Sequence, residues 1–185
     1  NELVQLGAHR VEVVAPRDHR ESWYVAEQVL LARGWARQQD VGLNPLFYKG
    51  SLEATDYLDW LHEHAVDHVA LPRTARLDFG SAREGKLLRA GPVTGLTPVW
   101  QDAEWVVYAV DDPVPIVEGL LTSTRTELTI QAQPGVLEVR VRWSRWLSVD
   151  GPACLERHGD DVRLRVAHVG LVTLSSRLTP KGHCP

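Results

Sequence analysis

The sequence predicts an α/β fold, with an N-terminal α/β/α layered domain on a mainly parallel sheet and a small antiparallel β-sandwich domain after it. Residues 1–112 alternate short apolar runs with segments of helical periodicity, a pattern typical of strands joined by helices. Residues 113–185 show no helical periodicity, and short strands follow one another there. The composition changes at Asp111-Asp112-Pro113, so we predict two domains, 1–112 and 113–185.

The first predicted element is a strand over His9–Ala15, which Pro16 ends. A helix over Arg20–Arg33 is expected next. Asp18 and Glu21 have the spacing of a capping box, apolar residues recur at helical steps, and a glycine follows the segment.

Further elements complete the predicted N-terminal domain. Tyr57, Leu58, Leu61 and Ala65 fall on one helical face. The others are a strand at Val66–Leu71, a helix after the capping box Ser81-x-x-Glu84, and a hairpin of Thr97–Gln101 with Trp105–Val110.

The C-terminal domain is predicted from alternation. Leu137, Val139, Val141 and Trp143 alternate with polar residues, and Val162, Leu164 and Val166 do the same, so each strand has one buried face. The charge also changes between the domains: residues 1–112 hold 11 Lys/Arg and 17 Asp/Glu, net −6, and residues 113–185 hold 9 and 7, net +2.

Composition excludes some classes of function. The net charge of −4 and the absence of a Lys/Arg cluster argue against a nucleic-acid partner. The apolar runs are strand-sized, well below the about 20 residues of a membrane span. Because the chain has no Met, we expect it to start inside a longer gene product. Cys154 and Cys184 fit either a disulfide or two buried thiols, and the residues alone leave both open.

The segment Gly34–Tyr48 is the candidate binding site, and we expect an ordered loop there. It combines aromatic rings with hydrogen-bonding side chains, a mixture suited to sugar rings. The candidate ligand-binding residues are Trp35, Arg37, Asp40, Asn44 and Tyr48. The alternative is that the aromatics, with Phe47, fill a gap between helices while Arg37 and Asp40 pair with each other.

Two other polar groups have simpler explanations. His62, His64 and His68 lack the spacing of a helical zinc motif, so no metal is expected. Asp18, His19 and Glu21 would place a base beside an acid at the end of the first strand, but helix capping explains the two carboxylates equally. No nucleophile elbow or phosphate loop is present, so no catalytic residue is assigned and no cofactor is expected.

Several segments resemble the C-terminal region of actinobacterial multipass integral membrane proteins. This family is mostly uncharacterised and is described as glycosyltransferase-like or as related to a 6-pyruvoyl-tetrahydropterin synthase membrane family. The element Gly34-Trp35-x-Arg37-Gln38-x-Asp40 with Leu46-Phe47-Tyr48 is the most specific part. The segments that carry the resemblance are Arg10–Val14, Leu31–Asp40, Asn44–Tyr48, Trp60–Pro72 and Val139–Trp146.

The resemblance implies an extracytoplasmic module that follows a bundle of membrane helices. Its partners would be the membrane domain of the parent chain and a glycan or polyprenyl-phosphate sugar. It also favours a Cys154–Cys184 disulfide, which we therefore predict. The expected function is non-catalytic, helping a membrane glycosyltransferase to recognise its sugar. The alternatives are a stand-alone enzyme acting on a small polar substrate, and a purely structural assembly module.

Overall fold

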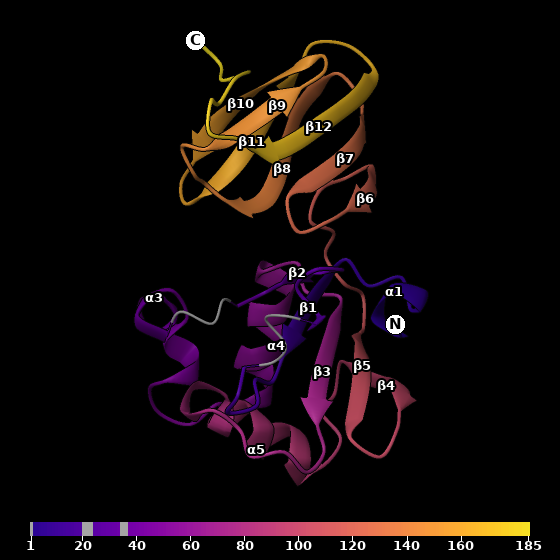
Figure 1. Cartoon of the computed structure of the whole chain (residues 1–185), viewed down its shortest axis with the longest axis vertical. Helices are drawn as coiled ribbons and strands as arrows, with labels where there is room; N and C mark the ends of the chain where they lie inside the picture. Colours follow the sequence, from indigo (N-terminus) through magenta and orange to yellow (C-terminus); the bar gives the residue numbers. More distant parts are fainter. Residues whose placement is uncertain (1, 20–23, 34–36) are drawn as a thin grey trace. The chain divides into compact units, whose positions relative to one another are not determined.

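The computed structural model describes residues 2–19, 24–33 and 37–185, and the chain divides into two compact units, 1–114 and 115–185. Figure 1 shows the elements of both units. The described residues form one five-stranded sheet in the first unit and two smaller sheets in the second. Each unit has its own buried core.

The sheet of the first unit is mixed, with strand order β2-β1-β3-β5-β4. β1 lies parallel to β2 and β3, whereas β3, β5 and β4 pair antiparallel. The strands are β1 (Arg10–Val13), β2 (Leu30–Leu31), β3 (His68–Pro72), β4 (Leu96–Gln101) and β5 (Trp105–Val110). The predicted hairpin of β4 and β5 is confirmed by their antiparallel register.

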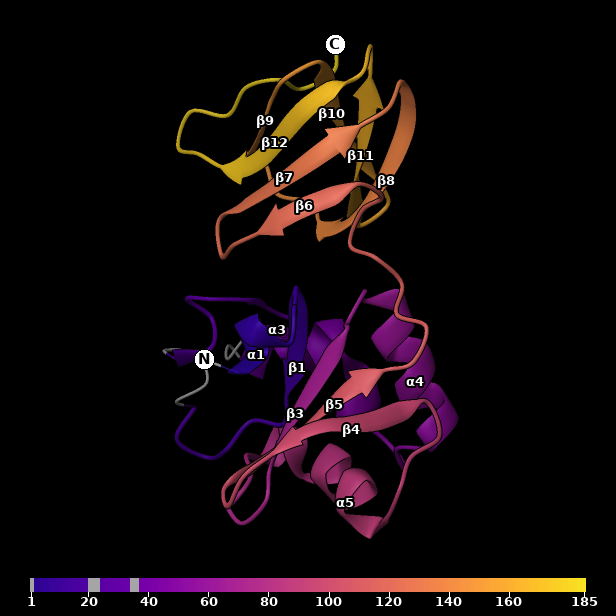
Figure 2. The same cartoon turned by 90° about the vertical axis from the view of Figure 1, so that its right-hand side faces the viewer.

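The longer helices of the first unit cover one face of this sheet (Figure 2). α4 (Ala54–Glu63) and α5 (Ala82–Ala90) pack there with the 3₁₀ helix η1 (Pro45–Phe47), and strand residues such as Val14, Val69 and Val106 point toward them. The other face is covered by the four-residue helix α1 (Glu2–Gln5) and by Val25 and Val29. Because side chains alternate along β1, Glu12 shares the face of Val14, beneath α4 and α5.

The predicted fold class is wrong. The described chain is mostly β, with twelve strands and few helices, and no α/β/α layered domain on a parallel sheet is formed by the described residues. The physical reason lies in residues 24–33, where a long helix was expected. The amides of Leu30 and Ala32 donate instead to the carbonyl oxygens of His9 and Val11 in β1, so tertiary pairing overrides the helical pattern. The start of that predicted helix, Arg20–Trp23, lies outside the described residues.

The prediction of an ordered loop at Gly34–Tyr48 is also wrong in part. Arg37–Leu43 form the helix α3, and η1 follows at Pro45–Phe47. Gly42 and the short length hide this helix from periodicity. Pro45 lies at the first position of η1, where a missing amide hydrogen costs nothing.

The second unit consists of two antiparallel sheets, β6-β7-β12-β9 and β10-β11-β8. The alternation predicted for β8 and β11 is present, because Val139, Val162 and Leu164 are buried while Glu138 and Arg165 face outward. The strands are β6 (Leu120–Ser123), β7 (Glu127–Ala132), β8 (Gly135–Arg142), β9 (Leu147–Asp150), β10 (Ala153–His158), β11 (Asp161–Val166) and β12 (Gly170–Ser176).

The C-terminal tail links the two sheets of this unit. The carbonyl oxygen of Lys181 accepts from the amide of Val149 in the edge strand β9. Gly182 and Cys184 then pair with Leu155 in the edge strand β10, at 2.8 and 2.9 Å. The tail therefore satisfies backbone groups that two sheet edges would otherwise leave open.

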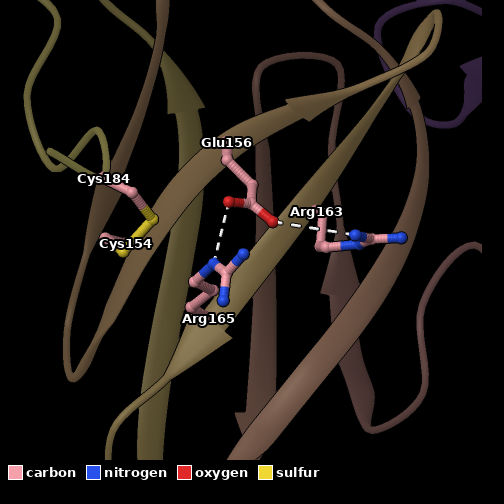
Figure 3. The surroundings of a disulfide bond; sticks show 5 residues. All are labelled: Cys154, Glu156, Arg163, Arg165 and Cys184. Carbon is pink, nitrogen blue, oxygen red and sulfur yellow. Dashed lines mark hydrogen bonds and ion pairs between the residues drawn. A yellow bond between two sulfur atoms is a disulfide. The ribbon is translucent and has the colours of Figure 1, made fainter.

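A disulfide fastens the tail, and this confirms the predicted pairing of Cys154 with Cys184 (Figure 3). No free cysteine is present. On the outer face of the same sheet, Glu156 accepts from Arg165 and lies 3.8 Å from Arg163. These ion pairs join β10 to β11 and do not involve the tail, whose one covalent link to β10 is the disulfide.

Breaking the disulfide should therefore destabilise the second unit. The bridge spans a sequence separation of 30 residues, and in the chain-entropy model a loop of that size contributes roughly 3 to 4 kcal/mol. We expect the double variant Cys154→Ser with Cys184→Ser to unfold at markedly lower urea concentration. As a control, the oxidised protein unfolded in urea should give no thiol signal; a stable double variant would contradict the role of the bridge.

Candidate functional site

An unusual group of polar side chains surrounds Arg33, which lies two residues after β2 and whose side chain is only 7% exposed. Its Nε and Nη2 atoms donate to Oε1 of Glu12 at 2.8 and 2.5 Å. Nη2 also donates to Oε2 of Glu84 in α5 at 2.6 Å, and Nη1 lies 3.6 Å from Oδ2 of Asp40 in α3. We call Arg33, Glu12, Glu84 and Asp40 the Arg33 cluster. It joins β1, α3 and α5 through one guanidinium.

Aromatic rings enclose the cluster. The Arg33 guanidinium carbon lies 3.7 Å from the centre of the fully buried Phe47 ring, a cation–π contact. Phe47 in turn meets the rings of Tyr57 and Trp60 edge to face, at 6.2 and 4.9 Å between centroids. The hydroxyl of Tyr57 donates to Oε1 of Glu84 at 2.6 Å. Glu84 thus has a partner on each of its oxygens.

The charges of the cluster do not balance if every group is ionised. Three carboxylates surround one guanidinium, and +1 − 3 gives a net charge of −2. Burial raises the pKa of Glu12 to about 8, with Glu84 adding to the rise and Arg33 opposing it. The buried Oε2 of Glu12 has no hydrogen-bond partner among residues 2–19, 24–33 and 37–185, an arrangement far less costly for a neutral acid than for a carboxylate. Burial therefore favours the protonated form of Glu12.

The pKa values of Glu84, Arg33 and Tyr57 also shift upward. Burial raises the pKa of Glu84 above its ordinary value, while Arg33 lowers it. Burial alone would lower the pKa of Arg33, but the carboxyl groups of Glu12 and Glu84 raise it, so the guanidinium stays charged. Burial and the neighbouring Glu84 raise the pKa of Tyr57, which keeps its proton as a donor.

A second chain of hydrogen bonds extends from Asp40 through the segment that follows α3. Asn44 donates to Oδ1 of Asp40 at 2.8 Å, and the hydroxyl of Tyr48 donates to Oδ2 at 2.5 Å. The ring nitrogen of Trp60 in α4 donates to Oδ1 of Asn44 at 3.1 Å. Asp40 and Asn44 are buried, 7% and 6% exposed, so they anchor this segment to α4.

The five candidate binding residues therefore differ in their surroundings. Trp35 lies outside the described residues, and Arg37 is described only as the first residue of α3. Asp40 and Asn44 have their side chains satisfied inside the unit, and Oδ2 of Asp40 lies 3.6 Å from Nη1 of Arg33. Tyr48 keeps part of its ring accessible. A role for these residues in ligand binding stays a prediction.

The other sequence candidates lie apart from one another. Nε2 of His19 is 3.7 Å from Oδ1 of Asp78, and the proposed partner Glu21 lies outside the described residues. His62 contacts the carbonyl oxygen of Asp111, His64 stacks on Trp60, and His68 contacts Asp67. Among the described residues, no group of three or more His, Cys, Asp or Glu side chains has the arrangement of a metal site.

Sequence analysis missed the importance of Glu12, Arg33, Tyr57 and Glu84. Glu84 was assigned to a capping box, but its carboxyl turns inward to Arg33. The hydroxyl of Ser81 does not cap α5; it accepts the amide of Ala15 at 3.0 Å. One usable signal was Glu12, a carboxyl placed among valines in a predicted buried strand, which requires a buried cation as partner.

Comparison with protein-family models, with curated proteins and with solved structures found no match. No helix of the described ranges is both long and apolar enough to cross a membrane.

The pKa of Glu12 makes stability depend on pH. A carboxyl whose folded pKa is raised binds its proton more tightly in the folded state, so folding stability is greatest at low pH and falls as pH rises. The window runs from the ordinary value of 4.5 to about 8. We expect the free energy of unfolding to fall by a few kcal/mol over this range, on the order of the 1.4 kcal/mol per pKa unit that linkage gives.

Glu12→Gln provides the matched control. Its amide oxygen can still accept from Arg33, but it cannot ionise, so the variant should lose much of the decrease in stability between pH 5 and pH 8.5. Urea titrations at both pH values measure this. Equal pH dependence in the two proteins would show that Glu12 is not the proton-bearing group.

Asn44 should contribute to stability through its two side-chain hydrogen bonds. Asn44→Ala leaves the indole N–H of the buried Trp60 without a protein partner, which should cost about 1 to 3 kcal/mol. Gln39→Ala, in the preceding helix α3, is the control, since Gln39 is exposed and its loss should change stability by less than about 0.5 kcal/mol. Thermal unfolding of both variants tests the anchoring role; equal melting temperatures would contradict it.

Proposed function

We propose that this chain is a non-catalytic extracytoplasmic module of a multipass membrane protein, and that it helps a membrane glycosyltransferase to recognise a glycan or lipid-linked sugar. The observation that carries the location is the Cys154–Cys184 disulfide. Disulfides persist in oxidising compartments and are rare in the reducing cytosol, so the bridge favours the outer side of the membrane. The resemblance to actinobacterial membrane proteins supports the same location.

The non-catalytic role is supported by how the acidic groups of the first unit are used. Glu84 and Asp40 have hydrogen-bond partners on both oxygens, and Glu12 is fully buried. A general acid or base must reach a proton on the substrate, and these carboxyl groups lie inside a packed core. Their role in the proposal is to hold α3 and η1 in place.

The binding role is supported by the same arrangement. Asp40 and Asn44 fix the segment internally and leave part of the Tyr48 ring accessible at its end. A preorganised aromatic surface suits a sugar ring, because little conformational freedom is lost when the ligand stacks on it. The proposal thus assigns anchoring to the buried polar residues and contact to the accessible ring.

The proposed location is tested in the full parent protein with a single introduced thiol. Arg125 is exposed between β6 and β7, so Arg125→Cys should be accessible without disturbing either strand. We expect a membrane-impermeant maleimide to label this variant in intact cells as fully as after lysis, while the native protein stays unlabelled. Labelling only after lysis would place the module in the cytoplasm and refute the proposal.

A further inference from the structure

Phe79 is a large apolar side chain that the fold leaves 64% exposed. It is the first residue of the 3₁₀ helix η2 (Phe79–Ser81), between β3 and α5. Its ring lies 6.4 Å from the ring of Tyr48, tilted by 43°. Residues from two distant segments therefore form one aromatic pair, which we call the Tyr48–Phe79 surface.

The backbone under Phe79 is firmly held. Oδ2 of Asp78 accepts the amide of Gly80 at 2.9 Å, and the amide of Asp78 donates to the carbonyl oxygen of Ala15. The carbonyl oxygen of Gly80 accepts from Arg33 at 3.3 Å. Because the turn is anchored, the exposed Phe79 ring has a fixed position, whereas a ring on a loose segment would not.

Tyr48 is fixed against the same turn. A Cβ atom at Gly80 would lie 2.5 Å from the Tyr48 hydroxyl oxygen, so only glycine allows this approach. The hydroxyl donates to Asp40, which Asn44 also holds. Both rings are thus oriented by contacts that lead back to the Arg33 cluster.

A polar pair lies at the start of the turn that carries Phe79. Nε2 of His19 is 3.7 Å from Oδ1 of Asp78, and the His19 side chain is 30% exposed. His19 also has a φ of 52°, in the left-handed region that non-glycine residues seldom adopt outside functional or tightly constrained sites. An aromatic face with hydrogen-bonding groups at its side matches a pyranose ring, which has an apolar face and a hydroxyl rim.

We propose that the Tyr48–Phe79 surface stacks against the sugar rings of a neutral glycan, with Phe79 as the principal contact. The inference rests on the function proposed above and adds Phe79, which is not among the residues that the sequence suggested. A neutral sugar is favoured over an anionic one because the Tyr48 hydroxyl donates to the carboxyl of Asp40, Asp78 directly precedes Phe79, and residues 1–112 carry a formal net charge of −6.

The test measures binding of purified protein to maltohexaose, cellohexaose and mannohexaose by calorimetry, with a heparin hexasaccharide as the anionic comparison. We expect a neutral hexasaccharide to bind. Phe79→Leu should weaken that binding at least about ten-fold, because it keeps an apolar side chain but removes the stacking face. Phe79→Trp keeps an aromatic stacking face, so this variant should bind the hexasaccharide as the native protein does.

Two controls isolate the effect. Val99→Ala, at an exposed apolar residue of β4, should leave binding unchanged. The melting temperature of Phe79→Leu should stay near that of the native protein, because the ring is mostly solvent-exposed.

The outcomes separate this inference from the proposed function. If Phe79→Leu leaves glycan binding unchanged, the Tyr48–Phe79 surface is not the binding surface, but the proposed glycan recognition still holds. Preference for the heparin hexasaccharide would overturn the neutral-sugar assignment. No binding of any saccharide by a protein whose Arg125→Cys variant is labelled from outside would refute glycan recognition and leave only the extracytoplasmic location.

Discussion

The first unit depends on the burial of one guanidinium. Arg33 donates to Glu12 in β1 and to Glu84 in α5, and it stacks on Phe47 between α3 and α4. Removing such a cation would leave carboxyl groups buried without compensation, a loss of about 3 to 5 kcal/mol where a buried pair is broken. Hydrophobic contacts alone would permit α5 to slide on the sheet, whereas these directional bonds fix its register.

The second unit solves a different problem, since its two sheets have open edges at β9 and β10. The tail pairs with both, and the disulfide keeps it there. Lys181 and Arg177 add ion pairs to Asp150, and these pairs are largely exposed and therefore weak. Each unit thus relies on one specific fastening, a buried ion cluster in the first and a covalent bridge in the second, in addition to its apolar core.

The elements that the sequence predicted correctly are those that depend on patterns within a single segment. The alternating strands β8 and β11, the helix α4 and the β4–β5 hairpin follow from periodicity within the segments themselves. The fold class failed because residues 24–33 pair with β1, a contact that no local pattern encodes. The Arg33 cluster was missed for the same reason, since Arg33 is 21 residues from Glu12 and 51 from Glu84 in sequence. The disulfide was predicted from the family resemblance, since the two cysteines by themselves fit a disulfide and free thiols equally.

The two interpretations of the Gly34–Tyr48 segment need not exclude each other. Asp40, Asn44 and Phe47 are buried and hold the segment as a structural plug would. Tyr48 and Phe79 lie at the accessible end of the same hydrogen-bond chain. In the proposed binding role, a change at Asp40 would weaken ligand binding by releasing the Tyr48 hydroxyl, although the Asp40 side chain is buried. The proposal thus couples stability and recognition through this carboxylate, so a loss of binding indicates direct contact only for a variant whose unfolding is unchanged.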